Sequence, residues 1–440
     1  LAAAVVSEYL TDYSKDFLAE AARTTYGEAF GGKAGYLAPV EGDTYALELW
    51  HGPTCAFKDY ALQLMPKLLV EAKKNLSRTE KTLILVATSG DTGKAALDGY
   101  HDIPGVEIAV FYPTGGTSEI QRLQMATQEG ANVAVYAVRG NFDDAQTGVK
   151  KVFGDKAIAA RLAERNIRLS SANSINWGRL VPQIVYYFAA YAQLLKAGKI
   201  AFGDKVDFCV PTGNFGDILA AYYAKRMGLP VNRLICASNS NNVLTDFLRT
   251  GIYDRNRPFH TTISPSMDIL ISSNLERLLF DLSGENDAEI RMYMDALGSA
   301  GRYQVSDNIK AKLDDAFWGG CCSEEGTEET IRRYWQDHNY LIDPHTAVAA
   351  EVLAQYRVAS GDETPAVVVS TASPYKFCGS VLTAIGETPC GDGLELLDQL
   401  HAVSGVPVPC RLAELKGKSR RFDKTVEKQA MEQAVLDFLK

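Results

Sequence analysis

The sequence has 440 residues, 46% of them hydrophobic and 22% charged, an ordinary globular composition with length for two or three domains. The formal charge of −9 and the lack of a broad basic run argue against nucleic acid as a partner, because the basic cluster at 416–424 is short and reads as a solvated loop. No apolar run reaches the roughly 18 residues that cross a bilayer, and the start lacks a basic segment, so we expect neither a membrane protein nor a signal peptide.

The cysteines and histidines indicate a reducing compartment and no metal site. Eight cysteines are dispersed without a Cys-x-x-Cys pair, and several lie inside apolar runs, where a free cysteine behaves as a small hydrophobic residue. The six histidines show neither His-x-x-x-His nor His-Glu-x-x-His spacing, so a zinc site is not expected. We therefore predict a cytoplasmic protein.

The N-terminal part leads into a lysine that invites two interpretations. Helical periodicity is present in residues 7–30, and a strand is predicted at 45–50. In residues 59–74 the apolar side chains again recur at helical spacing, so Lys58 lies at or just before the start of a helix. Phe57 and Ala56 precede it and an apolar run follows. A partly buried lysine has a lowered pKa and can attack carbonyl groups, whereas the simpler reading is a surface lysine of an amphipathic helix.

Strands and helices then alternate. The pattern predicts strands at 82–87, 106–112, 133–138 and 167–170, and helices from Lys94, at 118–129 and at 142–164. After a helix at 177–196, further strands are predicted at 206–210, 234–237 and 366–370. This alternation favours an α/β fold with parallel sheets covered on both faces. Glycine- and hydroxyl-rich loops follow three of these strands, at the edge where such sheets bind ligands.

Two of those loops are candidate anion sites. The stretch Gly-Asn-Phe-Gly at 213–216 lies between a strand and a helix, where backbone N–H groups can bind a phosphate; an ordinary tight turn is the alternative. The stretch 88–95 resembles a Walker A loop but has Thr88 at its first glycine and Ala95 where the Mg²⁺-binding hydroxyl belongs, so an NTPase is disfavoured. Its donors can still bind a carboxylate or phosphate.

Other polar groups have both structural and functional readings. The stretch 173–179 gathers amides, a hydroxyl and Arg179, which suits either phosphate binding or helix capping. Asp343 before Pro344 reads as a helix N-cap, which we favour over a catalytic His345. Cys55 has no matching His/Asn pattern, so burial is favoured over a nucleophilic role.

Together these segments resemble threonine synthase, a family of pyridoxal-phosphate enzymes of fold type II, the tryptophan-synthase β-like group. The stretches that carry the resemblance occur in the family's order between about residues 26 and 380. The most specific are the lysine stretch, residues 49–63, and Ser-Pro-Ser-Met-Asp-Ile at 264–269. The others are Thr-Ser-Gly-Asp-Thr-Gly at 88–93, Asn-Ser-Ile-Asn-Trp at 173–177, Gly-Asn-Phe-Gly at 213–216, 273–277 and Asp-Pro-His-Thr at 343–346.

The resemblance implies roles for individual residues. Lys58 is similar to the Schiff-base lysine and would be catalytic. The cofactor's 5′-phosphate would lie in the cup formed by Gly213, Asn214, Phe215 and Gly216. Asp91 would lie near its 3′-hydroxyl, and Thr371, with Ser373 as the alternative, near its pyridine nitrogen. Many relatives have asparagine at position 91 and histidine at 373. The substrate's carboxylate would contact the loop from Ser89 to Thr92, and its phosphate would contact Thr92, Asn173, Ser174 and Arg179.

The family reaction converts O-phospho-L-homoserine and water to L-threonine and phosphate, the last step of threonine biosynthesis, with pyridoxal 5′-phosphate as cofactor. Two alternatives stay open: another fold type II lyase such as a serine/threonine dehydratase, or a non-catalytic relative that binds a metabolite. The resemblance implies two parallel-sheet α/β domains with the cofactor between them. We expect 1–44 as an N-terminal portion, 45–80 and 197–440 as the large cofactor domain, 81–196 as the small substrate domain, and a monomer or homodimer.

Overall fold

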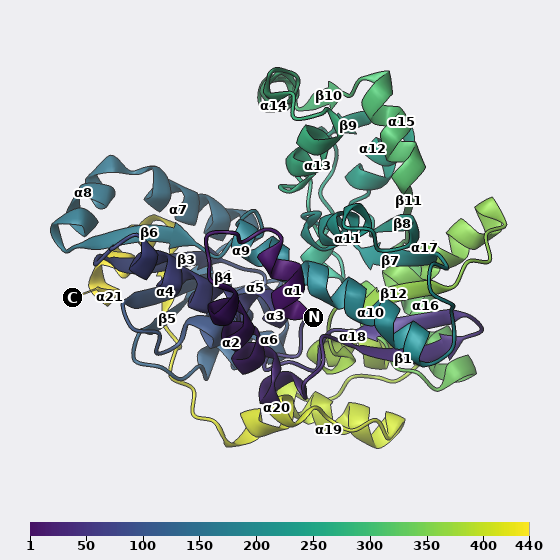
Figure 1. The fold of residues 1–440 in the computed structure, drawn as a ribbon. Coiled ribbons are helices and arrows are strands. Elements are labelled where there is room, and N and C mark those ends of the chain that lie inside the picture. The colour runs from purple at the N-terminus through teal and green to yellow at the C-terminus, as the bar shows by residue number, and fades with distance from the viewer. Residues whose placement is uncertain (440) are drawn as a thin grey trace.

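Two open sheets, each sandwiched between helices, form the body of the computed structural model, which describes residues 1–439 (Figure 1). The larger sheet has six strands, and its neighbours are parallel except for an antiparallel pair at one edge. Their order across the sheet is β1 (Tyr36–Glu41), β2 (Thr44–Glu48), β12 (Ala366–Ser370), β7 (Val206–Pro211), β8 (Val231–Ser238) and β11 (Phe317–Cys321).

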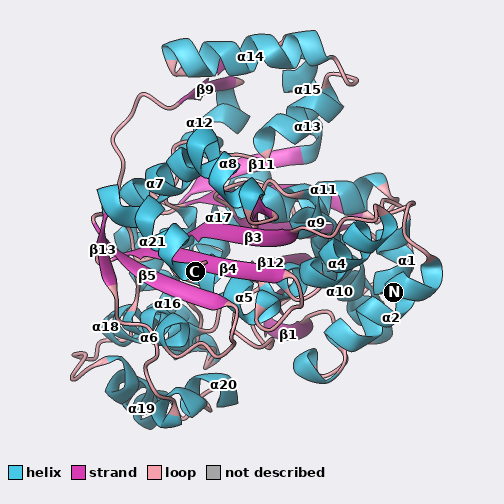
Figure 2. Cartoon of the chain, turned by 90° about the vertical axis from the view of Figure 1, so that its left-hand side faces the viewer, coloured by secondary structure: helices cyan, strands magenta, loops and turns pink. Residues whose placement is uncertain are grey.

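The smaller sheet is wholly parallel and has five strands. Their order is β13 (Thr425–Glu427), β5 (Val133–Arg139), β4 (Val106–Pro113), β3 (Lys81–Ala87) and β6 (Ile167–Ser171). Figure 2 shows β3, β4 and β5 running side by side, with β13 at the edge. The strands are almost entirely buried apolar runs, which is what a parallel sheet covered on both faces requires.

Alternate residues of β3 fill two separate cores, because successive strand side chains point to opposite faces. Leu83 and Leu85 pack under α7 (Phe142–Gly154), α8 (Lys156–Glu164) and α21 (Met431–Phe438). Ile84 and Val86 face the helices of the other layer: α3 (Asp59–Leu62), α4 (Met65–Asn75), α5 (Asp91–Tyr100) and α6 (Glu119–Ala126). The helix α3, which follows Lys58, lies between the two sheets, because its Leu62 belongs to this core and its Tyr60 to the core of the larger sheet.

The larger sheet is filled in the same way. Val367 and Val369 face one layer of helices: α1 (Ala2–Ser7), α2 (Lys15–Tyr26), α10 (Ile184–Lys196) and α11 (Gly216–Arg226). Ala366 and Val368 face α17 (Pro344–Ser360). The α17 helix begins at Asp343, whose carboxylate accepts from the backbone N–H groups of His345 and Thr346, so the expected N-cap is confirmed.

The remaining elements extend this body. A two-stranded sheet of β9 (Ile252–Asp254) and β10 (Arg302–Gln304) stands at the top of Figure 1 with α12 (Val243–Thr250), α13 (Leu275–Leu282), α14 (Asp287–Ala300) and α15 (Asp307–Ala316). The other helices are α9 (Trp177–Leu180), α16 (Glu324–His338), α18 (Cys378–Ala384), α19 (Gly393–Ser404) and α20 (Cys410–Ala413). Short 3-10 turns are η1 (Glu28–Phe30), η2 (Val181–Gln183), η3 (Pro265–Met267), η4 (Pro374–Phe377), η5 (Glu414–Gly417) and η6 (Lys428–Ala430).

The expected domain boundaries need two corrections. The range 197–440 was assigned to the large domain, but β13 pairs with β5 of the smaller sheet, and Val426 and Val435 are buried in its core. A sheet edge left open is a site for unwanted pairing, and β13 covers this one. The range 81–196 was assigned to the small domain, but α10 packs in the core of the larger sheet. The chain therefore crosses between the two sheets once more than expected.

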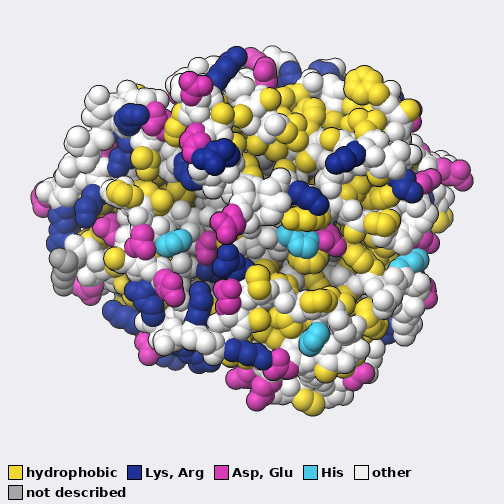
Figure 3. Space-filling model, turned by 60° about the horizontal axis from the view of Figure 1, so that its bottom comes forward, with side chains coloured by type: hydrophobic (Ala, Val, Ile, Leu, Met, Phe, Trp, Pro, Cys, Tyr) yellow, Lys and Arg dark blue, Asp and Glu magenta, His cyan; other side chains and the backbone are white. Residues whose placement is uncertain are grey.

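Three predicted helices are interrupted. The expected helix at 142–164 ends at Gly154, and a new one begins after Asp155, whose side chain accepts from the N–H groups of Ala157 and Ile158. The expected helices at 59–74 and 177–196 are also divided, into α3 and α4 and into α9, η2 and α10. Among residues 1–439 no helix is both long and apolar enough to cross a membrane. On the face in Figure 3, acidic and basic side chains lie interspersed with hydrophobic ones.

A close helix contact near Lys58 yields a stability prediction. A Cβ built on Gly99 in α5 would lie 2.0 Å from the carbonyl oxygen of Leu62 at the end of α3. We expect Gly99→Ala to destabilise the protein by about 1–3 kcal/mol, as overpacked cores typically do. Gly298→Ala is the matched control, because Gly298 also lies inside a helix and its Cβ would meet nothing within 4 Å. Denaturant unfolding of both variants checks this; equal stabilities would contradict it.

Candidate active site

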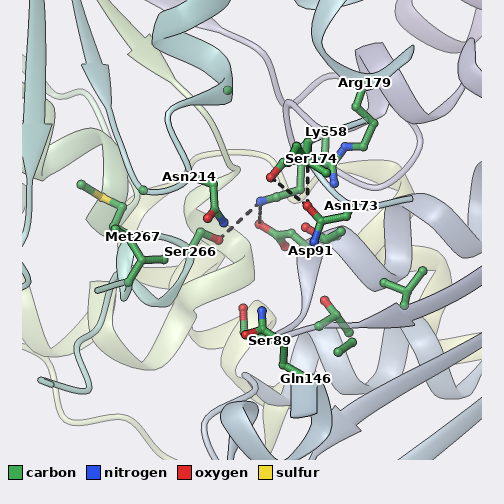
Figure 4. A pocket seen from close by; sticks show the side chains of 18 of the residues that line it. Lys58, Ser89, Asp91, Gln146, Asn173, Ser174, Arg179, Asn214, Ser266 and Met267 are labelled. Carbon is green, nitrogen blue, oxygen red and sulfur yellow. Dashed lines mark hydrogen bonds and ion pairs between the residues drawn. The ribbon is translucent and has the colours of Figure 1, made fainter. Parts of the chain in front are cut away.

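One cavity of about 430 Å³ is lined by nearly all the residues that the sequence singled out for a site; Ser373 and Cys55 are the exceptions. Its walls come from loops that follow strands of both sheets, β3, β6, β7 and β12, and from the stretch before α3 (Figure 4). Carboxyl ends of parallel strands are the usual ligand sites of α/β folds. The predicted residues that line it are Lys58, Ser89, Asp91, Thr92, Asn173, Ser174, Arg179, Gly213, Asn214, Phe215, Gly216 and Thr371.

The backbone turn before α3 places Lys58 at the cavity. The carboxylate of Asp59 accepts from the N–H of Thr54 at 2.8 Å and from its hydroxyl at 2.6 Å, which closes the turn. A side chain on Gly52 has no space, because its Cβ would lie 2.7 Å from that carboxylate and 2.6 Å from the ring of Phe30. The turn is therefore fixed by its own residues.

The Lys58 amine is buried and lies between two partners. Its side chain is 8% exposed, and its Nζ lies 3.6 Å from Asp91 Oδ2 and 3.4 Å from Ser266 Oγ, as the dashed lines in Figure 4 mark. Burial is the main cause that lowers the pKa of Lys58. The alternative of a surface lysine is thus excluded, and the environment favours the uncharged amine that nucleophilic and general-base chemistry needs.

Asp91 is held from three sides. Gln121 of α6 donates to its Oδ1 at 2.7 Å, and the Nζ of Lys376 lies 2.6 Å from the same oxygen. Gly90 before it has φ of 149°, and a Cβ there would lie 2.4 Å from the Gln121 amide, so only glycine fits. Lys376 was not predicted as part of the site. The signal was present, since Lys376 stands between Tyr375 and Phe377 as Lys58 stands after Phe57.

The Gly-Asn-Phe-Gly stretch forms a cup at the N-terminus of α11. Phe215 is left-handed, with φ of 63°, and the first two residues of the helix, Gly216 and Asp217, line the cavity, where helix N–H groups can bind an anion. A Cβ on Gly213 would lie 2.7 Å from the carbonyl oxygen of Ser266, so the two backbones touch. Asn274 donates to the carbonyl of Asn214 at 3.0 Å and fixes the cup from behind.

Asp217, next to the cup, carries an unusual carboxylate. Its Oδ1 accepts from the hydroxyls of Tyr186 and Tyr187 at 2.5 and 2.6 Å, while its buried Oδ2 has no hydrogen-bond partner among the described residues. Burial raises the pKa of Asp217 to about 6, against those two hydrogen bonds. A carboxyl group that is easily neutralised suits the neighbourhood of a bound phosphate.

Arg179 offers a cation from the opposite set of loops. It is 5% exposed and donates through Nη1 to the carbonyl of Ala172 at 2.8 Å, but its buried Nε has no partner among the described residues. Burial lowers the pKa of Arg179 to about 10. A buried guanidinium with an unused donor at a cavity wall is suited to an anionic ligand.

The structure separates the two hydroxyl candidates of the last loop. Thr371 lines the cavity, and its carbonyl accepts from the N–H of Phe57 at 2.8 Å. Ser373 is fully buried, and its hydroxyl accepts from the N–H of Tyr375, where it caps η4. The first of the two is therefore the one that can meet a ligand. Cys55 is buried, and burial raises the pKa of its thiol to about 12, which does not suit a nucleophile.

The stretch 264–269, to which the resemblance gave no role, forms a wall of the cavity. Asp268 pins it, because its Oδ1 accepts from Asn239, Asn241 and Thr262 at 2.7, 3.0 and 2.7 Å. His345 accepts the N–H of Ser266 through Nε2 at 3.2 Å. The sequence does not show that this stretch reaches the cavity, because its contact with His345 joins positions 79 residues apart.

The cavity thus suits a phosphorylated aldehyde cofactor. The cup at the helix N-terminus can supply backbone donors, Thr371 offers a hydroxyl, and the buried Lys58 lines the same cavity. In agreement, residues 37–306 match the family "Pyridoxal-phosphate dependent enzyme", which covers more than half of the chain, so the protein belongs to the pyridoxal-phosphate-dependent enzymes. Residues 346–435 match the family "Threonine synthase, C-terminal".

Comparison with individual relatives identifies the family within this class of enzymes. The chain is 42% identical over 368 residues to a threonine synthase of Pseudomonas aeruginosa, covering 83% of this chain and 75% of the relative. It is 41% identical over 363 residues to that of Saccharomyces cerevisiae, covering 78% and 69%. The protein therefore belongs to the threonine synthase family. It is also 42% identical over 379 residues to human threonine synthase-like 1, of which it spans 50%, with 84% of this chain covered.

Solved structures agree with this placement. Threonine synthase of Brucella melitensis, with pyridoxal phosphate bound, superposes with a TM-score of 0.86 at 35% identity, covering 99% of this chain and 88% of that one. The yeast threonine synthase has a TM-score of 0.87 at 33% identity and covers 100% and 88%. The fold is that of the fold type II pyridoxal-phosphate enzymes, as expected, and the cofactor is pyridoxal 5′-phosphate.

Proposed function

We propose that this protein converts O-phospho-L-homoserine and water into L-threonine and phosphate, and so acts as a threonine synthase in threonine biosynthesis. The observation that carries the proposal is the presence of two anion sites in one cavity, the cup at α11 and the buried Arg179. A cofactor with one phosphate occupies one of them. The second is then available for a substrate that carries its own phosphate.

The residues at the cavity would hold the cofactor as follows. Lys58 would bind it through Nζ, residues 213–216 would bind its 5′-phosphate, and Asp91 would lie near its 3′-hydroxyl. Thr371 would contact the ring nitrogen, and a hydroxyl leaves that nitrogen largely unprotonated, unlike a carboxylate partner. When bound, pyridoxal phosphate supplies an electron sink for negative charge that develops on the substrate.

The protein's own groups would then move protons and stabilise the leaving group. Lys58, as an uncharged amine, would remove a proton from the substrate's α-carbon and, once it has released that proton, another from the β-carbon. Thr92, Asn173, Ser174 and Arg179 would hold the substrate's phosphate as it leaves the γ-carbon, where negative charge develops. The γ-carbon would take up a proton in place of the one lost from the β-carbon and become the methyl group. The hydroxyl of water would add at the β-carbon, and Lys58 would return a proton to the α-carbon. Ser89 would hold the substrate's carboxylate.

The experiment is a product assay on the purified protein with pyridoxal phosphate. Phosphohomoserine should give threonine and inorganic phosphate in equal amounts, whereas a serine/threonine dehydratase would instead form keto acids from serine or threonine. Protein that stays colourless with added cofactor would favour a non-catalytic relative. That outcome matters because the chain spans only half the length of threonine synthase-like 1.

Two further features of the protein are proposed with this function. The eight cysteines, including the exposed Cys390 and Cys410, are free thiols, which fits a reducing compartment such as the cytoplasm. We also propose that the two sheets belong to separate domains that face each other across the cofactor, with β13 and α21 in the smaller one. The expected state is a monomer or homodimer.

A further inference from the structure

A second lysine, Lys376, lies fully buried behind the wall of the cavity. Its Nζ lies 2.6 Å from Asp91 Oδ1 and donates to the carbonyl of Thr54 at 2.9 Å. The other carboxylate oxygen of Asp91 lies 3.6 Å from the Nζ of Lys58. One buried carboxylate therefore stands between two buried lysines, one at the cavity and one behind it.

The shared carboxylate raises a question of charge balance. A buried carboxylate is stable only while a counter-charge stays beside it. If Lys58 were the only positively charged partner of Asp91, the carboxylate of Asp91 would be left without a counter-charge each time Lys58 lost its proton. Lys58 would then resist the uncharged state that both carbonyl attachment and proton removal require. With Lys376 present, Asp91 keeps a partner whatever the charge on Lys58.

The contacts of Lys376 show that it does not depend on Lys58 for its place. It belongs to η4, and its own carbonyl accepts from the hydroxyl of Ser118, the N-cap of α6, at 2.9 Å. The same helix supplies Gln121, which donates to Asp91. Two elements outside the lysine turn thus hold the carboxylate.

We infer that Lys376 is a positioning residue that holds Asp91 as a carboxylate with its own counter-charge and thereby allows Lys58 to work as an uncharged amine. The inference rests on the proposed function, since it concerns the lysine that would hold the cofactor. Lys376 acts through Asp91 and does not itself touch the substrate.

The groups around Lys58 give the direction of the effect. Burial lowers its pKa; Asp91 opposes this, and Arg179 and Lys376 add to the lowering. For Asp91, burial would raise the pKa, but Lys376 and then Lys58 outweigh it and hold that pKa well below its usual range. Asp217 faces Lys58 from α11. Removing Lys376 removes a repelling charge and leaves Asp91 to pair with Lys58, so the pKa of Lys58 should rise.

Three other ionisable side chains line the cavity, namely Lys150, Asp268 and His345. Asp268 is bound by Asn239, Asn241 and Thr262, and His345 lies 2.7 Å from Asp343 through Nδ1. The latter two have partners of their own that a change at Lys376 leaves in place.

The test uses Lys376→Met in the full chain. The protein is freed of cofactor, pyridoxal phosphate is added at a series of pH values, and the capture rate is followed by absorbance. Borohydride reduction and peptide mapping then identify the labelled lysine. We expect the midpoint of the pH profile to rise by about one unit, which is roughly tenfold slower capture below the midpoint. Circular dichroism verifies the fold.

Two further variants fix the sign. Lys376→Met/Asp91→Asn should return the midpoint toward wild type, because the unpaired carboxylate is gone. Asp91→Asn alone should lower the midpoint of the pH profile below that of the wild type. If Lys376→Met does not fold, the result with Asp91→Asn decides the inference. Lys94→Met is the control, since Lys94 is also buried but pairs with Asp98 at 3.0 Å. If the label is found at Lys58 but the midpoints of the pH profiles do not shift in the variants, the inference about Lys376 is overturned and the proposed function is not. Label on another lysine in wild type overturns the proposed function and this inference with it.

Discussion

Lys58→Ala should lower the rate of phosphate release from O-phospho-L-homoserine by a factor of about 10³ or more, because general-base catalysis alone contributes roughly 10²–10⁴. The variant also loses the point of attachment for the cofactor, so the loss should exceed that of a base alone. Lys58 has no substitute at the same place: the other buried lysine near it, Lys376, lies behind Asp91. Steady-state assays with saturating pyridoxal phosphate measure the effect.

The control for this variant is Lys94→Ala. It removes a buried lysine from α5, close to the same loop, but its Nζ contacts Asp98 and Gln128 and not the cavity. Its activity should stay within a few-fold of wild type. Substantial phosphate release by Lys58→Ala, at a rate near that of Lys94→Ala, would remove Lys58 from its role.

The alternation of strands and helices could be read from the sequence because buried parallel strands are continuous apolar runs. The runs at 82–87 and 366–370 correspond to β3 and β12 almost residue for residue. The unpredicted strands lack this signal. β11 contains Gly319 and Gly320, and β13 has only three residues, of which one is buried. Their strand form depends on the neighbours they pair with, which local sequence does not contain.

Many of the residues that line the cavity could also be predicted from the sequence. Loops that follow strands meet at one edge of a sheet, so residues from 58 to 371 converge on one cavity. The contacts behind that wall were not predictable. Lys376 reaches Asp91 across 285 positions of the chain, and only the packing of η4 against α6 brings them together. The aromatic neighbours of Lys376 indicate that it is buried, but nothing in the sequence indicates which carboxylate it pairs with.

Arg179→Leu should lower kcat/KM for phosphohomoserine about 10²–10³-fold, since truncating a buried charged partner of a ligand costs roughly 2–5 kcal/mol. The affinity for pyridoxal phosphate should change little, because the cup at 213–216 lies on loops of the other sheet. Cofactor titration by absorbance and phosphate-release kinetics measure the two effects separately. Arg168→Leu, an exposed change on the same sheet, is the control and should leave both unaffected.

The way the loss divides between kcat and KM tells what Arg179 does. If it only binds the substrate's phosphate, KM rises and kcat stays, because ground state and transition state lose the same contact. If it stabilises the phosphate as it leaves, kcat falls as well, since charge on that group grows in the transition state. Unchanged kinetics in Arg179→Leu would exclude this arginine from the substrate site.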